Sequence, residues 1–314
     1  MNKRLEQLKR IRSEAREIFT SCLIPVDPYA AVKHFIHFNG DNLIIGPEEE
    51  PIKELDLKKY ERISLLGAGK ATAPMARAIE DLFGKQIHKG MINVKYSFTE
   101  KLRSTEITEA GHPVPDQNGM AGTEKMLNYL ESAGEKDLIF SLISGGGSAL
   151  LPKPAGKIAL SEKQDLTQSL LESGASIDEI NAVRKHISLS KGGQMARAAF
   201  PATVVNLMLS DVVGDTTDVI ASGPFVPDSS TFKDVQNIFK KYDLNAVPPA
   251  IYEYIEAGVE GQVPETPNEG DKIFERVFNL IVGSNILALE AAEEKAKELG
   301  YETLILSSMV EGET

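Results

Sequence analysis

The chain alternates apolar runs of strand length with segments of helical periodicity, and this alternation limits the fold more than any other feature. Between residues 62 and 209, the runs ISLL, MINV, EITEA, LIFSLIS and TVVNLMLS are separated by stretches such as MARAIEDLF, in which apolar residues recur at helical spacing. Strands that are separated by helices pair in parallel. We therefore predict an α/β fold around a mainly parallel sheet.

The later part of the chain predicts a change of organisation. Residues 215–272 are rich in proline and read as a connection that carries small helices. The segments FNLIVGSN, ILALEAAEEKAKELG and ETLILSS then predict a strand, a helix and a second strand, which form one βαβ unit. We predict a Rossmann-like domain with N-terminal helices over 1–272 and the start of a second α/β domain over 273–314. We also expect the natural chain to continue, because one crossover cannot cover both faces of a sheet.

The composition excludes several classes of protein. The 314 residues carry a formal net charge of −12, which disfavours a nucleic-acid partner because that affinity depends on neutralising phosphates with Lys and Arg. No apolar stretch approaches the roughly 20 residues that a membrane helix requires. Cys22 is the only cysteine, so neither an intrachain disulfide nor a cysteine metal cluster can form. We predict a cytoplasmic enzyme that acts on a small molecule. Whether the protein forms a homodimer is left open.

An apolar run that ends in three glycines predicts an anion-binding loop. Residues 137–151 read DLIFSLISGGGSALL, which is one buried strand followed by a glycine turn and a helix start. Glycines after a strand allow positive φ and turn successive N–H groups toward one point, toward which the following helix also directs its positive end. The alternative is a tight strand-to-helix connection without a ligand. The candidate phosphate-binding or substrate-binding residues here are Ser144, Gly145, Gly146, Gly147 and Ser148.

A second glycine turn places Lys70 at the end of another predicted strand, and its Gly67 and Gly69 are further candidate phosphate-binding or substrate-binding residues. A lysine there can stabilise charge during phosphoryl transfer, whereas the alternative is a solvated lysine in a tight turn. Neither glycine loop has the spacing of a Walker motif. The turn is also a poor dinucleotide fingerprint, because Thr72 stands in place of the third glycine. This argues against NAD, although the basic end of the next strand leaves NADP open.

A third constellation follows the strand TVVNLMLS. It delivers Ser210 and Asp211 to the carboxyl end of the strand, and Asp215 follows in a glycine-containing loop. Ligands of open parallel sheets gather at such strand ends. A carboxylate there can accept a hydroxyl proton or hold Mg²⁺, which commonly bridges one or two carboxylates to phosphates. We therefore consider Asp211 a catalytic candidate and Asp211 with Asp215 a candidate metal pair; helix caps or turns are the alternative.

Two further segments carry basic residues. The segment INAVRKHIS predicts a helix over 176–186 that ends near Arg184, which can bind a carboxylate through two parallel hydrogen bonds. His186 is expected to be structural. His112, in AGHPVPD, is also expected to be a hydrogen-bonded structural histidine, with a role in the site as the less favoured interpretation.

Several motifs in order resemble the glycerate 2-kinase family, the MOFRL-containing glycerate kinases, some of which have been named as hydroxypyruvate reductases. They are GAGKATAPMA, AGHPVPD, LISGGGSALL, NAVRKHIS, LSKGGQMARAA, LSDVVGD and IASGPFVPD. The resemblance implies ATP-dependent phosphorylation of D-glycerate to 2-phosphoglycerate, with Mg²⁺, in a cleft between two α/β domains. It places the family's active-site lysine at Lys70 and its aspartate at Asp211.

The resemblance extends only to the start of the family's C-terminal domain. Members carry a GGET-like segment and a GGRNQE-like motif that contributes an arginine to the cleft, and residues 1–314 end before them. The resemblance therefore implies that part of the site lies outside this sequence. Two other functions stay open: an NADPH-dependent hydroxypyruvate reductase, and a sensor that binds phosphorylated ligands without turnover.

Overall fold

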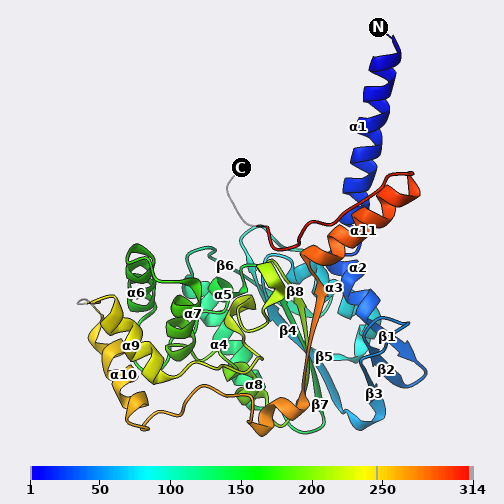
Figure 1. Ribbon diagram of the computed structural model, residues 1–314. Helices are drawn as coiled ribbons and strands as arrows, with labels where there is room; N and C mark the ends of the chain where they lie inside the picture. The colour runs from blue at the N-terminus through cyan, green and yellow to red at the C-terminus, as the bar shows by residue number, and fades with distance from the viewer. Residues whose placement is uncertain (1, 245–246, 311–314) are drawn as a thin grey trace.

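The main sheet has six strands, and every neighbouring pair runs parallel. The computed structural model describes residues 2–244 and 247–310. In spatial order the strands are β6 (Thr105–Ala110), β5 (Ile87–Lys95), β4 (Arg62–Ala68), β7 (Asp137–Ser144), β8 (Thr203–Leu209) and β9 (Val277–Gly283). Helices lie on both sides of this sheet (Figure 1). The predicted α/β fold with a parallel sheet is confirmed.

The direction in which the sheet grows reverses between β4 and β7. From β4 the chain proceeds outward through β5 to β6, then returns to add β7, β8 and β9 on the other side. This is the order 3-2-1-4-5-6 of doubly wound nucleotide-binding sheets, whose ligands bind at the carboxyl ends of the strands where the order reverses. Because β4 and β7 pair directly, the loops that follow them are neighbours.

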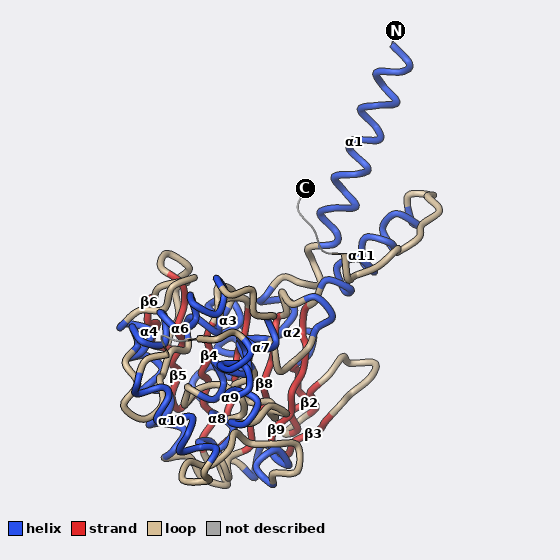
Figure 2. Tube along the Cα trace, turned by 60° about the vertical axis from the view of Figure 1, so that its left-hand side comes forward, coloured by secondary structure: helices blue, strands red, loops and turns tan. Residues whose placement is uncertain are grey.

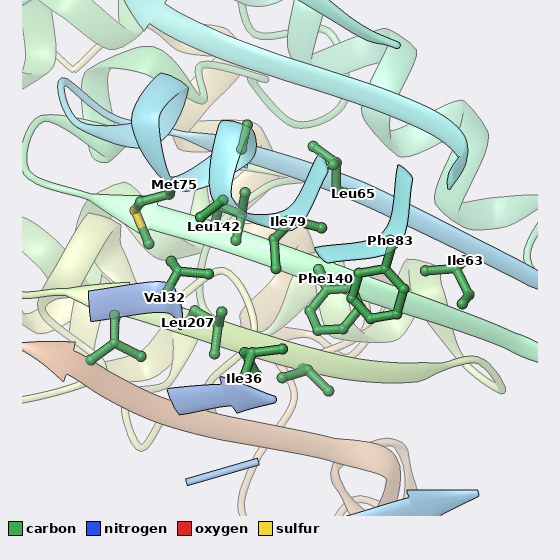
Figure 3. Packing of buried hydrophobic residues seen from close by; sticks show 14 of the residues in the cluster. Val32, Ile36, Ile63, Leu65, Met75, Ile79, Phe83, Phe140, Leu142 and Leu207 are labelled. Atoms are coloured by element: carbon green, nitrogen blue, oxygen red, sulfur yellow. The ribbon is translucent and has the colours of Figure 1, made fainter. Parts of the chain in front are cut away.

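Alternating side chains of the central strands fill one core on each face of the sheet. In β7, Phe140 points to the face covered by α2 and α3, whereas Ile139 points to the face covered by α4 and α8. Figure 3 shows the first core, where Phe83 of α3 packs on Phe140 with a centroid separation of 5.1 Å. The four helices are α2 (Pro28–Phe35), α3 (Thr72–Phe83), α4 (Gln117–Glu131) and α8 (Gln194–Ala199).

A group of helices with its own core packs beside the sheet (Figure 1). Its members are α6 (Leu160–Glu172), α7 (Ile177–His186), α9 (Phe232–Lys241) and α10 (Pro249–Val259). Leu166, Val183, Val235 and Ile251 are among the buried residues that hold the group together. The predicted helix over 176–186 is confirmed by α7. The segment 215–272 contributes α9 and α10 to this helical unit, so it is more than a connection.

The N-terminal region contains strands that the sequence analysis missed. After α1 (Asn2–Cys22), which projects from the rest of the molecule in Figures 1 and 2, an antiparallel sheet forms from β1 (Ile36–Asn39), β2 (Asn42–Ile45) and β3 (Lys53–Asp56). Gly40 turns the first hairpin with a φ of +62°. These strands have four residues each, too few to produce a clear alternating pattern.

The C-terminal region differs from the predicted βαβ unit. β9 and α11 (Asn285–Glu298) form as expected, but residues 301–310 contain no strand, so the predicted strand ETLILSS is wrong for the described structure. A strand needs a second strand to pair with, and no described strand pairs with this segment. β9 itself pairs with β8 of the main sheet. The division into 1–272 and 273–314 stays a prediction. None of the helices described here has the length and apolarity to cross a membrane.

Candidate active site

Two glycine turns meet at the point where the strand order reverses. The loop after β4 and the loop after β7 are joined by a hydrogen bond from the Lys70 N–H to the Gly145 carbonyl oxygen, at 2.9 Å. The Ser144 hydroxyl accepts a hydrogen bond from the Ala71 N–H at 3.0 Å and lies 3.2 Å from the Thr72 hydroxyl. The two loops therefore form one connected backbone platform.

Three of the predicted phosphate-binding residues lie inside this platform. The Ser144 side chain is buried, and its hydroxyl contacts protein groups on the other loop. Gly67 and Gly69 are also buried, and a Cβ atom at either would collide with β7 or with Ser144. These residues hold the two loops in close contact, so their position is one of support beneath the surface of the site.

Lys70 and Asp211 come together on the surface of the platform, although they follow different strands. A Cβ atom at Gly145 would collide with the Asp211 carboxylate, which shows how closely that side chain approaches the loop. A Cβ atom at Gly146 would lie 3.5 Å from the Lys70 Cγ atom. Lys70 is half-buried and Asp211 is exposed. The strand ends thus bring the stem of the Lys70 side chain and the Asp211 carboxylate to two adjacent glycines.

The glycine loop after β7 continues into a very short helix. Gly146 has a φ of +85°, a conformation that favours glycine, and Gly147 begins α5, which ends at Leu150. The sequence analysis expected the dipole of the following helix to assist anion binding. A helix of four residues has too small a dipole for that role, because the macrodipole grows from many aligned peptides. Any contribution must come from the local N–H groups.

His112 is a third side chain at this platform. A Cβ atom at Gly146 would lie 2.8 Å from two atoms of the imidazole ring, Cδ2 and Nε2. Burial lowers the pKa of His112, the nearby charges of Lys70 and Lys95 lower it further, and the Asp211 carboxylate partly opposes them. The imidazole is therefore neutral at pH 7. Its place beside Lys70 and Asp211 favours the role in the site over the purely structural one.

The loop after β8 is fixed by a buried ion pair. Lys185 of α7 places its Nζ atom 2.9 Å from Asp218 and 3.2 Å from Asp228. Ser210 shapes the start of this loop, because its hydroxyl accepts a hydrogen bond from the Val212 N–H at 3.2 Å. The loop that carries Asp211 is therefore anchored to the helical unit.

The loop after β8 carries the aspartates that the sequence analysis selected as a candidate magnesium site. Asp218 is engaged by Lys185, and Asp215 is half-buried with a positive φ of 53° in the turn after Val213. No group of three or more His, Cys, Asp or Glu side chains arranged to hold a metal occurs among residues 2–244 and 247–310. The Asp211 carboxylate does meet the requirement of Mg²⁺ for one or two protein carboxylates plus phosphate oxygens.

A cavity of about 580 Å³ borders the glycine loop, and His112 of the platform is among the residues that line it. Gly146 and Ser148 line it, together with Arg184 of α7 and two lysines that the sequence analysis did not select, Lys163 of α6 and Lys191 before α8. Lys163 is 6% exposed and Lys191 is 1% exposed. Arg184 and Ser148 therefore lie in a pocket of basic residues; we call Lys163, Arg184 and Lys191 the cation pocket.

The charges of the cation pocket raise one another's electrostatic energy. Burial and the Arg184 charge lower the pKa of Lys163 to about 7. Burial lowers the pKa of Lys191 as well, with Lys163 and Arg184 adding to the effect, and burial lowers the pKa of Arg184. The Nζ atom of Lys163 has no hydrogen-bond partner in the described part of the chain. The pocket therefore gathers basic side chains whose charged forms are disfavoured by burial and by one another.

One sequence signal could have identified Lys163. On α6, Leu160, Leu166 and Leu170 form the buried stripe of an amphipathic helix, and Lys163 occupies the same stripe. A lysine at an apolar position is unusual, because its charge is expensive to bury without a partner. For Lys191, the signal was its place before Gly192 and Gly193, which turn the chain with positive φ.

A doubly wound sheet whose strand ends bring glycine loops, a lysine and an aspartate together belongs to the class of α/β proteins that bind phosphorylated ligands at the switch point. The comparison with known families is specific: residues 14–256 match the family described as domain of unknown function DUF4147. The chain belongs to this family, and curated relatives that it resembles are named glycerate kinases.

Relatives with curated names agree with this assignment. The chain is 38% identical over 304 residues to the glycerate 2-kinase of Pyrococcus horikoshii, covering 96% of this chain and 66% of the relative. It is 41% identical over 270 residues to the D-glycerate 2-kinase of Thermotoga maritima, covering 86% and 62%. The crystal structure of a Thermotoga maritima glycerate kinase superimposes with a TM-score of 0.80 at 37% identity, covering 95% of this chain and 65% of that chain. The chain thus spans somewhat less than two thirds of these relatives.

Proposed function

We propose that this protein transfers the γ-phosphoryl group of ATP to the 2-hydroxyl of D-glycerate and releases 2-phosphoglycerate. The observation that carries the proposal is the meeting of Lys70 and Asp211 at Gly145 and Gly146, where the order of the strands reverses. A cation for phosphate charge and a carboxylate for a hydroxyl proton are what phosphoryl transfer needs. The names of the relatives supply the identity of the acceptor.

Each residue at the platform has a proposed role. The Lys70 ammonium offsets negative charge on the transferred phosphoryl group, and N–H groups of Gly145 to Gly147 donate hydrogen bonds to it. The acceptor hydroxyl oxygen attacks the γ-phosphorus while the bond to the bridging oxygen of ADP breaks. Asp211 orients this hydroxyl and accepts its proton. Catalysis then rests on positioning and charge neutralisation.

The proposal includes Mg²⁺. When bound, Mg²⁺ would neutralise phosphate charge, and Asp211 is the carboxylate best placed to hold it. Asp215 stays a weaker candidate for this role. His112, neutral and beside Gly146, would contribute a hydrogen bond without adding a charge. Ser210 and Ser144 would act by shaping the loops.

The proposal also includes a cytoplasmic location, which rests on the composition of the chain. A homodimer is left as an open prediction. The second α/β domain would complete the site, as the family resemblance implies.

The decisive experiment measures turnover and the chemical position of the product phosphate. Full-length protein is supplied with ATP, Mg²⁺ and D-glycerate, and phosphorus NMR identifies 2-phosphoglycerate. We expect Lys70→Ala to lower kcat by about a thousandfold, because an electrostatic contact to the transferring group is lost. Lys85→Ala is the matched control, since Lys85 is an exposed lysine beyond the opposite end of α3.

Three outcomes would contradict the proposal. Wild-type turnover in Lys70→Ala would remove the role of the lysine. Oxidation of NADPH with hydroxypyruvate, without phosphorylation of glycerate, would favour the reductase that the sequence analysis left open. Binding of phosphorylated ligands without turnover of either substrate would favour the sensor.

A further inference from the structure

The cation pocket lies next to the platform yet is separate from Lys70 and Asp211. Three segments supply its charges: α6 supplies Lys163, α7 supplies Arg184, and the turn before α8 supplies Lys191. Gly146 and Ser148 form the wall that it shares with the glycine loop. Nothing in the roles proposed for Lys70 and Asp211 requires these three cations.

Lys163 is the strongest sign that the pocket receives a ligand. Its side chain is more than nine-tenths buried, lines the cavity, and its Nζ atom has no hydrogen-bond partner among the described residues. A buried ammonium without a partner destabilises a protein, and leucine would fit the apolar stripe of α6 better. Such an arrangement is expected where an anion supplies the missing partner.

The pocket is also a fixed structure. The Lys191 Nζ atom donates a hydrogen bond to the Ser148 carbonyl oxygen at 2.6 Å. The Ser148 hydroxyl lies 3.0 Å from that of Ser222, which donates to the Asn181 side chain of α7 at 3.3 Å. These contacts join the glycine loop to the helical unit, so the wall of the pocket and the Lys191 side chain are held in place before any ligand arrives.

The charge and size of the pocket indicate the class of ligand. Three cations suit a ligand with several negative charges better than they suit one carboxylate. At about 30 Å³ for each water, the cavity of about 580 Å³ holds far more than a three-carbon acid. Val114, Pro152 and Leu171 add apolar surface to the lining, as a nucleobase or ribose requires.

We propose that the cation pocket binds the polyphosphate of a nucleoside di- or triphosphate, with Lys163, Arg184 and Lys191 as its ligands. Gly146 lies between this pocket and Lys70, so the terminal phosphoryl group points across the glycine loop toward Lys70 and Asp211. This inference extends the proposed function by assigning the donor nucleotide to the helical side of the loop. The acceptor then approaches from the side of the strand ends.

Binding can be measured without turnover, which separates this inference from the proposed function. The chain is titrated calorimetrically at pH 7 with ADP and, separately, with inorganic tripolyphosphate. Both are expected to bind, and Lys163→Met and Arg184→Met are each expected to weaken binding at least tenfold. Lys157→Met, which changes an exposed lysine of the preceding loop, is the matched control and should stay within twofold.

A second measurement shows whether the variants fold. Lys163→Met removes a buried charge without a partner, so it should raise the unfolding temperature of the ligand-free protein. It should also reduce the rise in unfolding temperature that added ADP produces. A purely structural lysine would give a lower unfolding temperature and no selective loss of the ADP effect. These two readouts therefore separate a ligand role from a packing role.

Three results would overturn the inference. They are no binding of ADP or tripolyphosphate, binding that Lys163→Met and Arg184→Met leave unchanged, and loss in these variants of D-glycerate or 2-phosphoglycerate binding alone. If the protein binds ADP through the pocket but does not phosphorylate glycerate, the proposed function fails and the pocket assignment stands.

Discussion

The two sides of the Gly145–Gly147 loop differ in how they hold charge. On the strand-end side, half-buried Lys70 and exposed Asp211 bring opposite charges together at loop tips. On the helical side, Lys163 and Lys191 are 6% and 1% exposed and carry charge of one sign. The first side carries both signs of charge near the surface, whereas the second side is a cavity in which basic side chains are buried.

This difference predicts different tasks. A carboxylate near the surface can accept a proton from a substrate, and a cation beside it can stabilise negative charge that develops during the reaction. An enclosed excess of positive charge is unfavourable in the empty protein and becomes favourable only when a permanent anion enters. The comparison therefore places the chemical step on the strand-end side and the binding of a charged ligand on the helical side.

Lys185 connects the two sides, so its removal has the largest expected effect. Lys185→Met breaks the contacts to Asp218 and Asp228. Because Asp228 is only 3% exposed, its carboxylate is then buried without its cation. We expect the free energy of unfolding to fall by about 3–5 kcal/mol, measured by urea denaturation. The loop that carries Asp211 should also loosen.

An exposed ion pair provides the control for Lys185. Lys125 pairs with Glu106, and both side chains are about half exposed. Lys125→Met should therefore change the free energy of unfolding by about 1 kcal/mol or less, because solvent screens exposed pairs. Equal losses in Lys125→Met and Lys185→Met would show that the two sides are not joined through Lys185.

The strand-end side of the site was largely predictable from sequence. A strand that ends in glycines places its loop at the carboxyl edge of a parallel sheet, so Lys70, Gly145 and Asp211 are brought near one another by the topology alone. The cation pocket was not predictable in this way. Lys163 and Lys191 meet Arg184 only through the packing of α6, α7 and the turn before α8, and sequence spacing does not report such packing.

The fold shows the same contrast. The strands of the main sheet were recognisable because buried parallel strands are long and continuously apolar. The short hairpin around Gly40 was missed, although Asn39-Gly40 is a turn signal. The segment 302–308 was predicted as a strand from its apolar pattern, yet a strand also depends on a neighbour, which sequence pattern does not supply.

Gly145→Ala tests whether the strand-end side acts independently. The φ of Gly145 is not positive, so alanine is allowed there, but its Cβ atom would displace the Asp211 carboxylate. We expect kcat to fall about a hundredfold, because small displacements of a reacting group are costly, while ADP affinity stays within threefold. Gly134→Ala, with no atom closer than 4.0 Å to its Cβ, is the control and should retain turnover. Parallel losses of turnover and ADP affinity would contradict the separation of the two sides.

The smallest expected effect is a change of tripolyphosphate affinity with pH. The pKa of Lys163 is lowered to about 7, so its protonated fraction falls about fivefold from pH 7 to pH 8, and the anion binds the protonated form. The loss of the Lys163 proton should therefore lower affinity about fivefold.

The other ionisable groups that line the pocket place limits on this pH prediction. Arg184 stays charged across this range, Asp165 is exposed to solvent, and neutral His112 is unchanged. The pKa of Lys191 is also lowered, by burial and by Lys163 and Arg184, so some pH dependence remains in Lys163→Met. Calorimetric titrations at pH 7, 7.5 and 8 should give a steeper loss for the wild type than for Lys163→Met. If affinity falls equally with pH in the wild type and in Lys163→Met, Lys163 does not pair with the anion. The burial of Lys163 would then not mark the helical side as the binding side.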